Sequence, residues 1–297
     1  MYPYNYALEG YSSPRRIACR ICDGMEKFMF GLLQEGLFSR LFSTGIPTDG
    51  AWKYYLTYFG FALVVIIAAY LLGSINTAIV VSKTLYRDDI RTHGSGNAGL
   101  TNMLRTYGKG AAGLTLLGDL LKTAVAILIA GIFWGFGYVG GVSVGGGFYG
   151  HEMGFCYIAG LFAVIGHVFP IYYRFKGGKG VLATATMALI LSPLPFLILL
   201  LTFIAIVAIS KYVSLGSVIG AIFYPVALFA YFKIFFAENT TMPLLMAFAS
   251  IMLAILIVWC HRENLERISN QTERKLSFKK KPEVAKNPIK DEGNDEE

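Results

Sequence analysis

Charged residues are scarce in this sequence. Asp, Glu, Lys and Arg make up 15% of the 297 residues, whereas an average soluble domain contains about 25%. Apolar residues reach 55%. This composition excludes an intrinsically disordered chain, which needs high charge and low hydrophobicity. It is typical of a protein whose surroundings are lipid.

Cysteine is also scarce, and four Cys in this length exclude a small disulfide-stapled domain. Cys19 and Cys22 form a C-x-x-C pair, but no second pair and no nearby His completes a zinc site. Metal ligands are not evident, so we expect no cofactor. The net charge of +7 suggests nucleic-acid binding, but the basic residues lie between apolar runs, as in the cytoplasmic loops of a membrane protein. No nucleic-acid partner is therefore expected.

Long apolar runs predict an all-α integral membrane protein with about seven transmembrane helices, because a helix needs roughly 20 apolar residues to cross a bilayer. A seventh run, Val181–Ser192, is short and ends at a proline break. We expect a multi-pass protein of the cell (cytoplasmic) membrane. The six clearest runs are Tyr55–Val81, Ala111–Phe136, Phe155–Tyr172, Pro193–Ile209, Ser217–Phe236 and Pro243–Cys260.

Lys and Arg gather in alternate loops, and the loops 137–154 and 237–242 contain neither residue. By the positive-inside rule the basic loops and the C-terminus are cytoplasmic, and the N-terminus is outside. Six basic residues in the first 53 argue against this orientation, but the later loops agree with one another.

Three segments follow from this pattern. Residues 1–53 form an N-terminal extension in which apolar positions from Ile17 to Leu33 recur at helical spacing and predict an interfacial amphipathic helix. Residues 54–264 form the membrane-embedded domain, and residues 265–297 form a charged cytoplasmic tail.

The first cytoplasmic loop is rich in glycine and small polar residues. Glycine permits positive φ, and consecutive N–H groups in such turns form an anion-binding concavity. The forked guanidinium of Arg105 strengthens such a site. The pattern favours a phosphate site over a flexible linker. The residues expected to form it are Gly94, Ser95, Gly96, Asn97, Thr101, Asn102 and Arg105.

The second loop ends in Gly-Gly-Lys-Gly at the start of a predicted helix. A helix N-terminus with a nearby Lys favours an anion, and the missing P-loop spacing favours a simple phosphate over a nucleotide. Alternatively, the lysines only reflect positive-inside topology, and His167 is a packed residue within a span. The expected binding residues are Lys176, Gly177, Gly178, Lys179 and Gly180.

The third stretch is split between two places. Ser214 and Ser217 lie after the fifth long run, and His261 and Asn264 follow the last one. On a helix the last two residues, at i and i+3, face the same way. The alternative is an ordinary polar exit from a membrane helix. Within the second run, Asp119 and Lys122 either neutralise each other, or Asp119 faces the loops.

Together these stretches resemble the three cytoplasmic motifs of the bacterial acyl-phosphate:glycerol-3-phosphate acyltransferases, the PlsY family. They are Gly94-Ser-Gly-Asn with Thr101-Asn-x-x-Arg105, Gly166-His-x-Phe-Pro with Phe175-Lys-Gly-Gly-Lys-Gly180, and Ser214-Leu-Gly-Ser217 with His261-Arg-Glu-Asn264. The resemblance covers about residues 55–274. It implies Gly-rich cytoplasmic loops that form an active site, with acyl phosphate and glycerol 3-phosphate as substrates and the lipid bilayer as partner.

The resemblance also implies a reaction and residue roles. A fatty acyl group passes to the 1-hydroxyl of glycerol 3-phosphate, giving 1-acylglycerol 3-phosphate (lysophosphatidate) and phosphate, as the first committed step of phospholipid biosynthesis. The implied catalytic residues are Ser95, Arg105, Lys179, His261 and Asn264, with Glu263 as a structural carboxylate.

The implied donor is a mixed anhydride and is already activated, so holding the two substrates together supplies much of the catalysis. Either His261 or the departing phosphate takes the hydroxyl proton, and we favour the phosphate. The His-x4-Asp plan of other acyltransferases is absent, because no His is followed five residues later by Asp. The alternative function is a transporter of a phosphorylated small molecule. No inverted repeat is visible, however, and the motifs lie at one face instead of the midplane.

Overall fold

The structure is a computed structural model that describes residues 37, 51–134, 138–139, 142–143, 151–235 and 244–276. Within these ranges the regular elements are helices, apart from two short antiparallel strands, β1 (Tyr138–Val139) and β2 (Val142–Ser143). The predicted all-α class is confirmed. The amphipathic helix expected between Ile17 and Leu33 lies outside the described residues.

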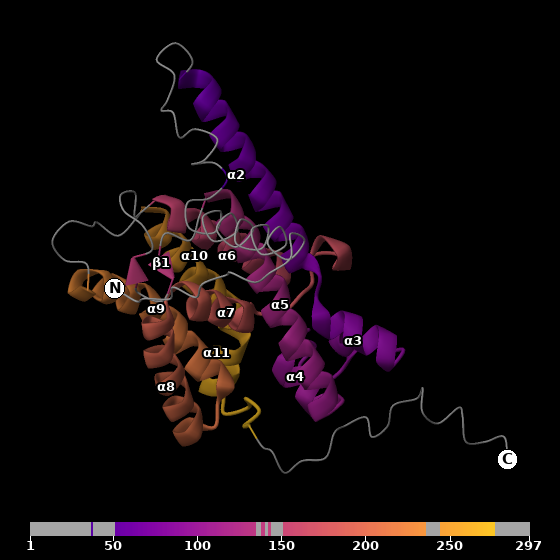
Figure 1. The fold of residues 1–297 in the computed structure, drawn as a ribbon. Helices are drawn as coiled ribbons and strands as arrows, with labels where there is room; N and C mark the ends of the chain where they lie inside the picture. Colours follow the sequence, from indigo (N-terminus) through magenta and orange to yellow (C-terminus); the bar gives the residue numbers. More distant parts are fainter. Residues whose placement is uncertain are drawn as a thin grey trace, which may run out of the picture.

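The helices follow the apolar runs, with short connections at the motifs (Figure 1). The 3-10 helices η1 (Ile90–Thr92) and η2 (Ile171–Tyr173) lie in the first and second motif loops. The α-helices are α2 (Ala51–Ser74), α3 (Thr77–Leu85), α4 (Leu100–Thr106), α5 (Lys109–Trp134), α6 (His151–Val168), α7 (Val181–Leu191), α8 (Pro193–Ser210), α9 (Val213–Phe235), α10 (Leu244–Cys260) and α11 (Arg262–Ser269).

Five helical segments of the described ranges are long and apolar enough to cross a bilayer, and α10 with α11 forms a sixth candidate that is bent by 50°. The seventh predicted span, which corresponds to α7, is apolar but is shorter than these candidates. Helix α7 has 11 residues and is therefore about 16 Å long, roughly half the thickness of the hydrocarbon core. The five are Tyr55–Leu85, Lys109–Trp134, Met153–Tyr173, Pro193–Ser210 and Val213–Ile234.

Helix α6 lies at the centre of the bundle, and α2, α5, α7 and α10 all pack against it. Close packing of α2 on α6 depends on glycine. A Cβ at Gly73 would overlap the backbone of Ala163, and a Cβ at Gly166 would overlap the carbonyl of Tyr70. Small residues at such crossings let helix backbones approach closely, as is common in membrane proteins.

The first predicted span is interrupted near its end. Helix α2 ends at Ser74 and α3 begins at Thr77, because Asn76 caps α3 by accepting a hydrogen bond from the Ile79 N–H at 3.2 Å. The amide nitrogen of Asn76 also donates to the carbonyl of Ala98 at 3.3 Å, in the first motif loop. The break therefore positions that loop.

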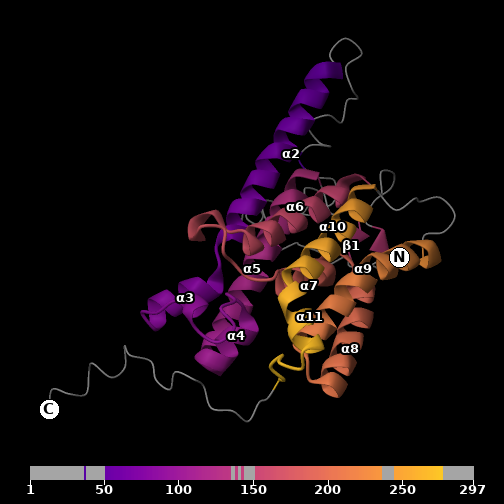
Figure 2. The same ribbon diagram turned by 180° about the vertical axis from the view of Figure 1, so that it is seen from behind.

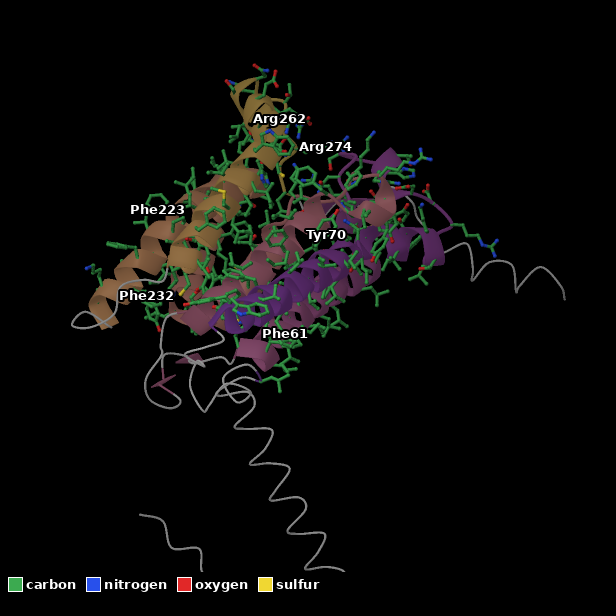
Figure 3. The ribbon with its side chains drawn as sticks, turned by 90° about the horizontal axis from the view of Figure 1, so that it is seen from above. Phe61, Tyr70, Phe223, Phe232, Arg262 and Arg274 are labelled. Carbon is green, nitrogen blue, oxygen red and sulfur yellow. The ribbon has the colours of Figure 1, made fainter. Side chains whose placement is uncertain are left out.

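The motif-bearing elements lie at one end of the bundle. In Figures 1 and 2, α3 and α4 lie at the end away from the start of α2. Figure 3 likewise shows Arg262 and Arg274 at one end of the molecule and Phe61 and Phe232 towards the other. The predicted domain boundary at residue 264 falls inside α11. The fold extends at least to Leu276, whose N–H donates to the Lys211 carbonyl at 2.8 Å.

Candidate active site

A cavity of about 680 Å³ lies where α4 to α11 and the first motif loop meet, and it brings together residues of all three motifs. All five predicted catalytic residues line it: Ser95, Arg105, Lys179, His261 and Asn264. The predicted binding residues that also line it are Gly94, Asn97, Thr101, Asn102, Gly180, Ser214 and Ser217. Four others are not among the lining residues: Gly96, Lys176, Gly177 and Gly178.

The first motif loop is held in shape by Asn102. Its side-chain oxygen accepts a hydrogen bond from the Ser95 N–H at 3.1 Å, and its amide nitrogen donates to the carbonyls of His93 (3.0 Å) and Ile90 (3.2 Å). Gly94 has a φ of +57°, and a Cβ there would overlap the Asn102 side chain. Asn102 therefore fixes the shape of the loop beside the cavity. Because its side chain already makes three hydrogen bonds to the protein, it has little capacity left to hydrogen-bond a ligand.

Arg91 joins the first and second motif loops. It forms an ion pair with Asp89 at 2.7 Å and donates to the carbonyls of Tyr173 (3.2 Å) and Lys176 (3.3 Å). Arg91 is one of the basic residues that predicted a cytoplasmic loop, and no further role was expected for it. The Asp-x-Arg spacing was the available signal, because a carboxylate two residues away can orient a guanidinium.

The two glycines before Lys179 pack against the end of α6. The N–H groups of Gly177 and Gly178 donate to the carbonyls of Val168 and His167, both at 3.1 Å. A Cβ on either glycine would overlap His167. Their N–H groups are thus already bonded to the protein, so these glycines fix the path of the loop that delivers Lys179.

A chain of polar contacts connects the second motif with the last helix. The Lys179 ammonium donates to the side-chain oxygen of Asn264, and the Asn264 amide nitrogen donates to Glu273 at 2.7 Å. Arg267 (2.8 Å) and the Ser214 hydroxyl (2.9 Å) also donate to Glu273. These bonds lower the pKa of Glu273 although its burial raises it. Glu273 thereby fixes the orientation of the Asn264 amide.

The expected structural carboxylate, Glu263, is the wrong residue. Its side chain is 69% exposed and lies 4.0 Å from Arg267 across the surface of α11. The side chain of Glu273 is 10% exposed and has three donors. Glu273 lies in the predicted tail of residues 265–297, although the motif resemblance extends to about residue 274 and includes it.

His261 is held in one tautomer. It is 4% exposed, and its Nδ1 lies 2.8 Å from the Ile257 carbonyl, which can only accept. Nδ1 therefore bears the hydrogen, and the lone pair of Nε2 is left for the cavity. Burial, followed by the positive charge of Lys179, lowers the pKa of His261 to about 4. The imidazole is neutral at physiological pH.

The polar wall of the cavity is positively charged. Four basic side chains line it, Arg105, Lys179, Arg267 and Arg274, against two acidic ones, Asp119 and Glu273. Burial and the nearby charge of Arg267 lower the pKa of Lys179. An anion bound here would reverse that effect, because an opposite charge favours the ammonium form. The arrangement is suited to a phosphate group.

Most of the remaining lining, on α7, α8 and α9, is apolar. Leu182 and Leu189 of α7, Phe196, Leu199 and Phe203 of α8, and Ala221 of α9 line it. A cavity with a cationic wall beside an apolar wall fits a ligand that joins a phosphate to a fatty chain. Within the described ranges, no group of three or more His, Cys, Asp or Glu side chains is placed to hold a metal ion.

Comparison with known proteins adds an independent line of support. The family model described as "Glycerol-3-phosphate acyltransferase" matches residues 63–271. Glycerol-3-phosphate acyltransferases of Coxiella burnetii and Geobacillus kaustophilus are 40% and 37% identical over 219 and 214 residues, covering 73% and 72% of this chain and 98% and 95% of their own. The crystal structure of PlsY, an integral membrane glycerol 3-phosphate acyltransferase, in its glycerol 3-phosphate form superposes with a TM-score of 0.61 at 32% identity, covering 73% of this chain and 96% of that one. Its lysophosphatidic acid form gives a TM-score of 0.59 at 31% identity, covering 73% and 95%.

Proposed function

Because this chain belongs to the glycerol-3-phosphate acyltransferase family, we propose that it transfers a fatty acyl group from acyl phosphate to the 1-hydroxyl of glycerol 3-phosphate. The observation that supports this most directly is the cavity, whose cationic wall of motif residues adjoins an apolar wall. Both proposed substrates contain a phosphate, and one of them also contains a fatty chain.

The reaction requires positioning more than a strong nucleophile. The glycerol oxygen attacks the acyl carbonyl carbon, the bond from that carbon to the phosphate oxygen breaks, and phosphate leaves with the hydroxyl proton. The products are 1-acylglycerol 3-phosphate and inorganic phosphate. Fixed donors that neutralise the developing charge, and the pairing of both substrates in one cavity, supply the rate enhancement.

Each motif residue has a role suited to its chemistry. Arg105, with its forked guanidinium, and Lys179 bind phosphate oxygens, and the exposed hydroxyl of Ser95 adds a donor. The Nε2 lone pair of His261 accepts a hydrogen bond from the glycerol 1-hydroxyl. Asn264 aligns Lys179 through its side-chain oxygen. Ser214 supports this alignment through Glu273.

The protein is an integral, multi-pass membrane protein, and the motif end of the bundle is proposed to face the cytoplasm. The short α7 does not alter the predicted sidedness of the loops. Lys179 precedes α7, Ser214 follows α8, and both line the cavity, so the α7–α8 pair starts and ends on the same side. We place the membrane-embedded domain at residues 54–276, because the tail as far as Leu276 packs on the fold.

A phosphate-release assay tests the proposal. Purified protein is given palmitoyl phosphate with glycerol 3-phosphate, and then with glycerol, which has the hydroxyl but lacks the phosphate. We expect release that depends on glycerol 3-phosphate and is at least 100-fold weaker with glycerol. Equal release with both acceptors would contradict a phosphate-binding acceptor site. Uptake of glycerol 3-phosphate into proteoliposomes without product formation would instead support the transporter alternative.

A further inference from the structure

The apolar part of the cavity lies along one face of helix α9. Ser214, Ser217, Ala221 and Tyr224 follow one another on this face at intervals of three or four residues, and all four line the cavity. Ser214 marks the polar end, because its hydroxyl donates to Glu273 at 2.9 Å. The face therefore leads from the polar wall into the apolar part, and its residues show how deep the cavity is.

The cavity ends at Tyr224. The next residue on the same face, Leu228, is 0% exposed, packs in the hydrophobic core and is not among the lining residues. Ten residues of helix from Ser214 to Tyr224 correspond to about 15 Å along its axis. This is about half of the roughly 30 Å hydrocarbon core, which two layers of fatty chains fill. The cavity is therefore about as deep as one fatty chain of ordinary membrane length.

Helices α7 and α8 reach the same end point. Helix α7 starts after Lys179, in the polar wall, and α8 leads back to Ser214. Ser192 joins the two helices at their far ends. It is 1% exposed, and its hydroxyl lies 3.1 Å from the hydroxyl of Tyr224. The three helices thus meet at Ser192 and Tyr224, away from the polar wall.

This hydrogen bond places the tyrosine ring across the end of the cavity. Tyr224 belongs to α9, and the hydroxyl at the tip of its side chain reaches the junction of α7 and α8. The Ser192 hydroxyl donates to the Ala188 carbonyl at 3.2 Å, so it accepts the hydrogen of Tyr224. The ring therefore spans the space between these helices, and it is held there without a ligand.

The side chains on this face of α9 change in size at the same point. Ser217, Gly220 and Ala221 are small, and a Cβ added to Gly220 would have no atom within 4 Å. Tyr224, which is 3% exposed, is the next lining residue after them. A fatty chain that lies beside α9 therefore meets small residues until it reaches the ring.

We propose that Tyr224, held by Ser192, closes the acyl-chain pocket and sets the longest acyl chain that is transferred efficiently. The inference rests on the proposed function and deepens it, because it names the determinant of chain length for the acyl donor. The donor comes from lipid, where its methylene groups are already in an apolar medium, so a longer chain gains little from the pocket. Methylene groups beyond the closed end must instead push against the ring, and overfilling a packed interior is destabilising.

The inference is tested by competition between two donors. Purified protein receives palmitoyl and arachidoyl phosphate at equal concentration with glycerol 3-phosphate, and the two lysophosphatidate products are quantified by mass spectrometry. The product ratio reports the ratio of the two kcat/KM values, and comparison with wild type removes differences in micelle partitioning. We expect Tyr224→Ala to raise the arachidoyl-to-palmitoyl ratio about tenfold over that of wild type.

Two further variants separate the volume of the ring from its contribution to stability. Tyr224→Phe keeps the ring and removes the hydrogen bond, so its Tm should fall while the product ratio stays within about threefold of wild type. Leu228→Ala is the matched control, because it truncates a buried side chain one turn further along the same face, outside the cavity lining. It should lower the Tm and leave the ratio unchanged. An equal rise of the ratio in Leu228→Ala and Tyr224→Ala would overturn the inference.

Ala221→Leu tests the same pocket without removing a contact, and it decides the question alone if Tyr224→Ala does not fold. It fills the pocket one turn before Tyr224, so it should lower the palmitoyl-to-lauroyl product ratio about tenfold. The alternative path for the chain is sideways into the lipid, past Leu189, a lining residue that is 46% exposed. Wild-type product ratios in both Ala221→Leu and Tyr224→Ala would indicate this path and overturn the inference.

A binding measurement keeps this inference distinct from the proposed function. If wild-type protein forms no lysophosphatidate from palmitoyl phosphate, the proposed function fails. The end of the pocket is then tested with hexadecyl and eicosyl phosphate, which have no acyl group to transfer, through the rise in Tm that each causes. A rise with eicosyl phosphate that is larger in Tyr224→Ala than in wild type, relative to hexadecyl phosphate, would still support the closed end. The same relative rise in both proteins would overturn it.

Discussion

Replacing His261 by Gln is expected to slow acyl transfer only modestly. The Nδ1 hydrogen of His261 is bonded to the Ile257 carbonyl, so the side chain offers the substrate an acceptor at Nε2. A Gln side-chain oxygen can occupy nearly the same position. Losing part of one neutral hydrogen bond costs about 0.5–1.5 kcal/mol, which corresponds to a decrease of about 2- to 10-fold in kcat.

The low pKa of His261 supports positioning over proton abstraction. With a pKa of about 4, its imidazole holds a proton less well than a phosphate dianion, whose conjugate acid has a pKa of about 6. Burial of His261 therefore favours phosphate as the proton acceptor. A general base at this position would instead make a decrease of 10²- to 10⁴-fold expected on its removal.

The assay is kcat as a function of pH for wild type, His261→Gln and His261→Asn, measured side by side. Between pH 5.5 and 8 the wild-type and Gln profiles should be parallel, because the titration there belongs to the substrates. Below about pH 5 the activity of wild type should fall further relative to that of the Gln variant, since protonating His261 removes its acceptor. His261→Asn, too short to reach with an acceptor, should be about tenfold slower than His261→Gln. A Gln variant that binds glycerol 3-phosphate but has a kcat reduced by more than 100-fold at every pH would refute positioning.

Three further substitutions test other parts of the site. Arg105→Lys should keep the wild-type Tm within a few degrees and lose about 100-fold or more in kcat/KM, because an ammonium cannot grip phosphate bidentately; near-normal kinetics would remove this role. Glu273→Gln should be about 1–3 kcal/mol less stable at pH 7 in denaturant titrations. Since folding lowers the pKa of Glu273, its stabilisation exists above pH 4.5 and is lost as the pH falls below it, so the difference between the two proteins should shrink in acid and an unchanged gap would contradict the network. Gly220 lines the apolar wall with no atom within 4 Å of an added Cβ, so Gly220→Leu should favour shorter acyl chains, whereas Gly113→Leu, equally open but not lining the cavity, should not.

The parts of this protein that could be predicted from sequence are those set by local pattern. Runs such as Ala111–Phe136 predicted α5 to within two residues at each end, because lipid imposes length and apolarity on a span. The run Val181–Ser192 could not be assigned in this way, since α7 has only 11 residues and is partly buried against other helices, with Ala183 and Met187 fully buried. Hydropathy alone does not distinguish burial in protein from burial in lipid.

Site residues could be predicted from the sequence where the chemistry of the residue type indicates its role. Arg105 and Lys179 were recognised as cations in glycine-rich loops, and both line the cavity. Gly177 and Gly178 were assigned to phosphate, but their N–H groups bond to α6, a contact between segments that spacing does not reveal. Glu273 was missed because its contacts depend on the fold. Ser214 is 59 residues away in the sequence. Asn264 lies on α11, beyond the bend that follows α10.

The most direct test of the account follows both halves of the donor in one reaction. Purified protein is incubated with acyl-[³²P]phosphate and [¹⁴C]glycerol 3-phosphate, and the products are separated and counted. The account predicts ¹⁴C-labelled lysophosphatidate, esterified at the 1-hydroxyl, and [³²P] inorganic phosphate in a ratio of 1:1. Recovery of ³²P in the lipid product, or phosphate release without ¹⁴C-labelled lysophosphatidate, would contradict acyl transfer from acyl phosphate to glycerol 3-phosphate.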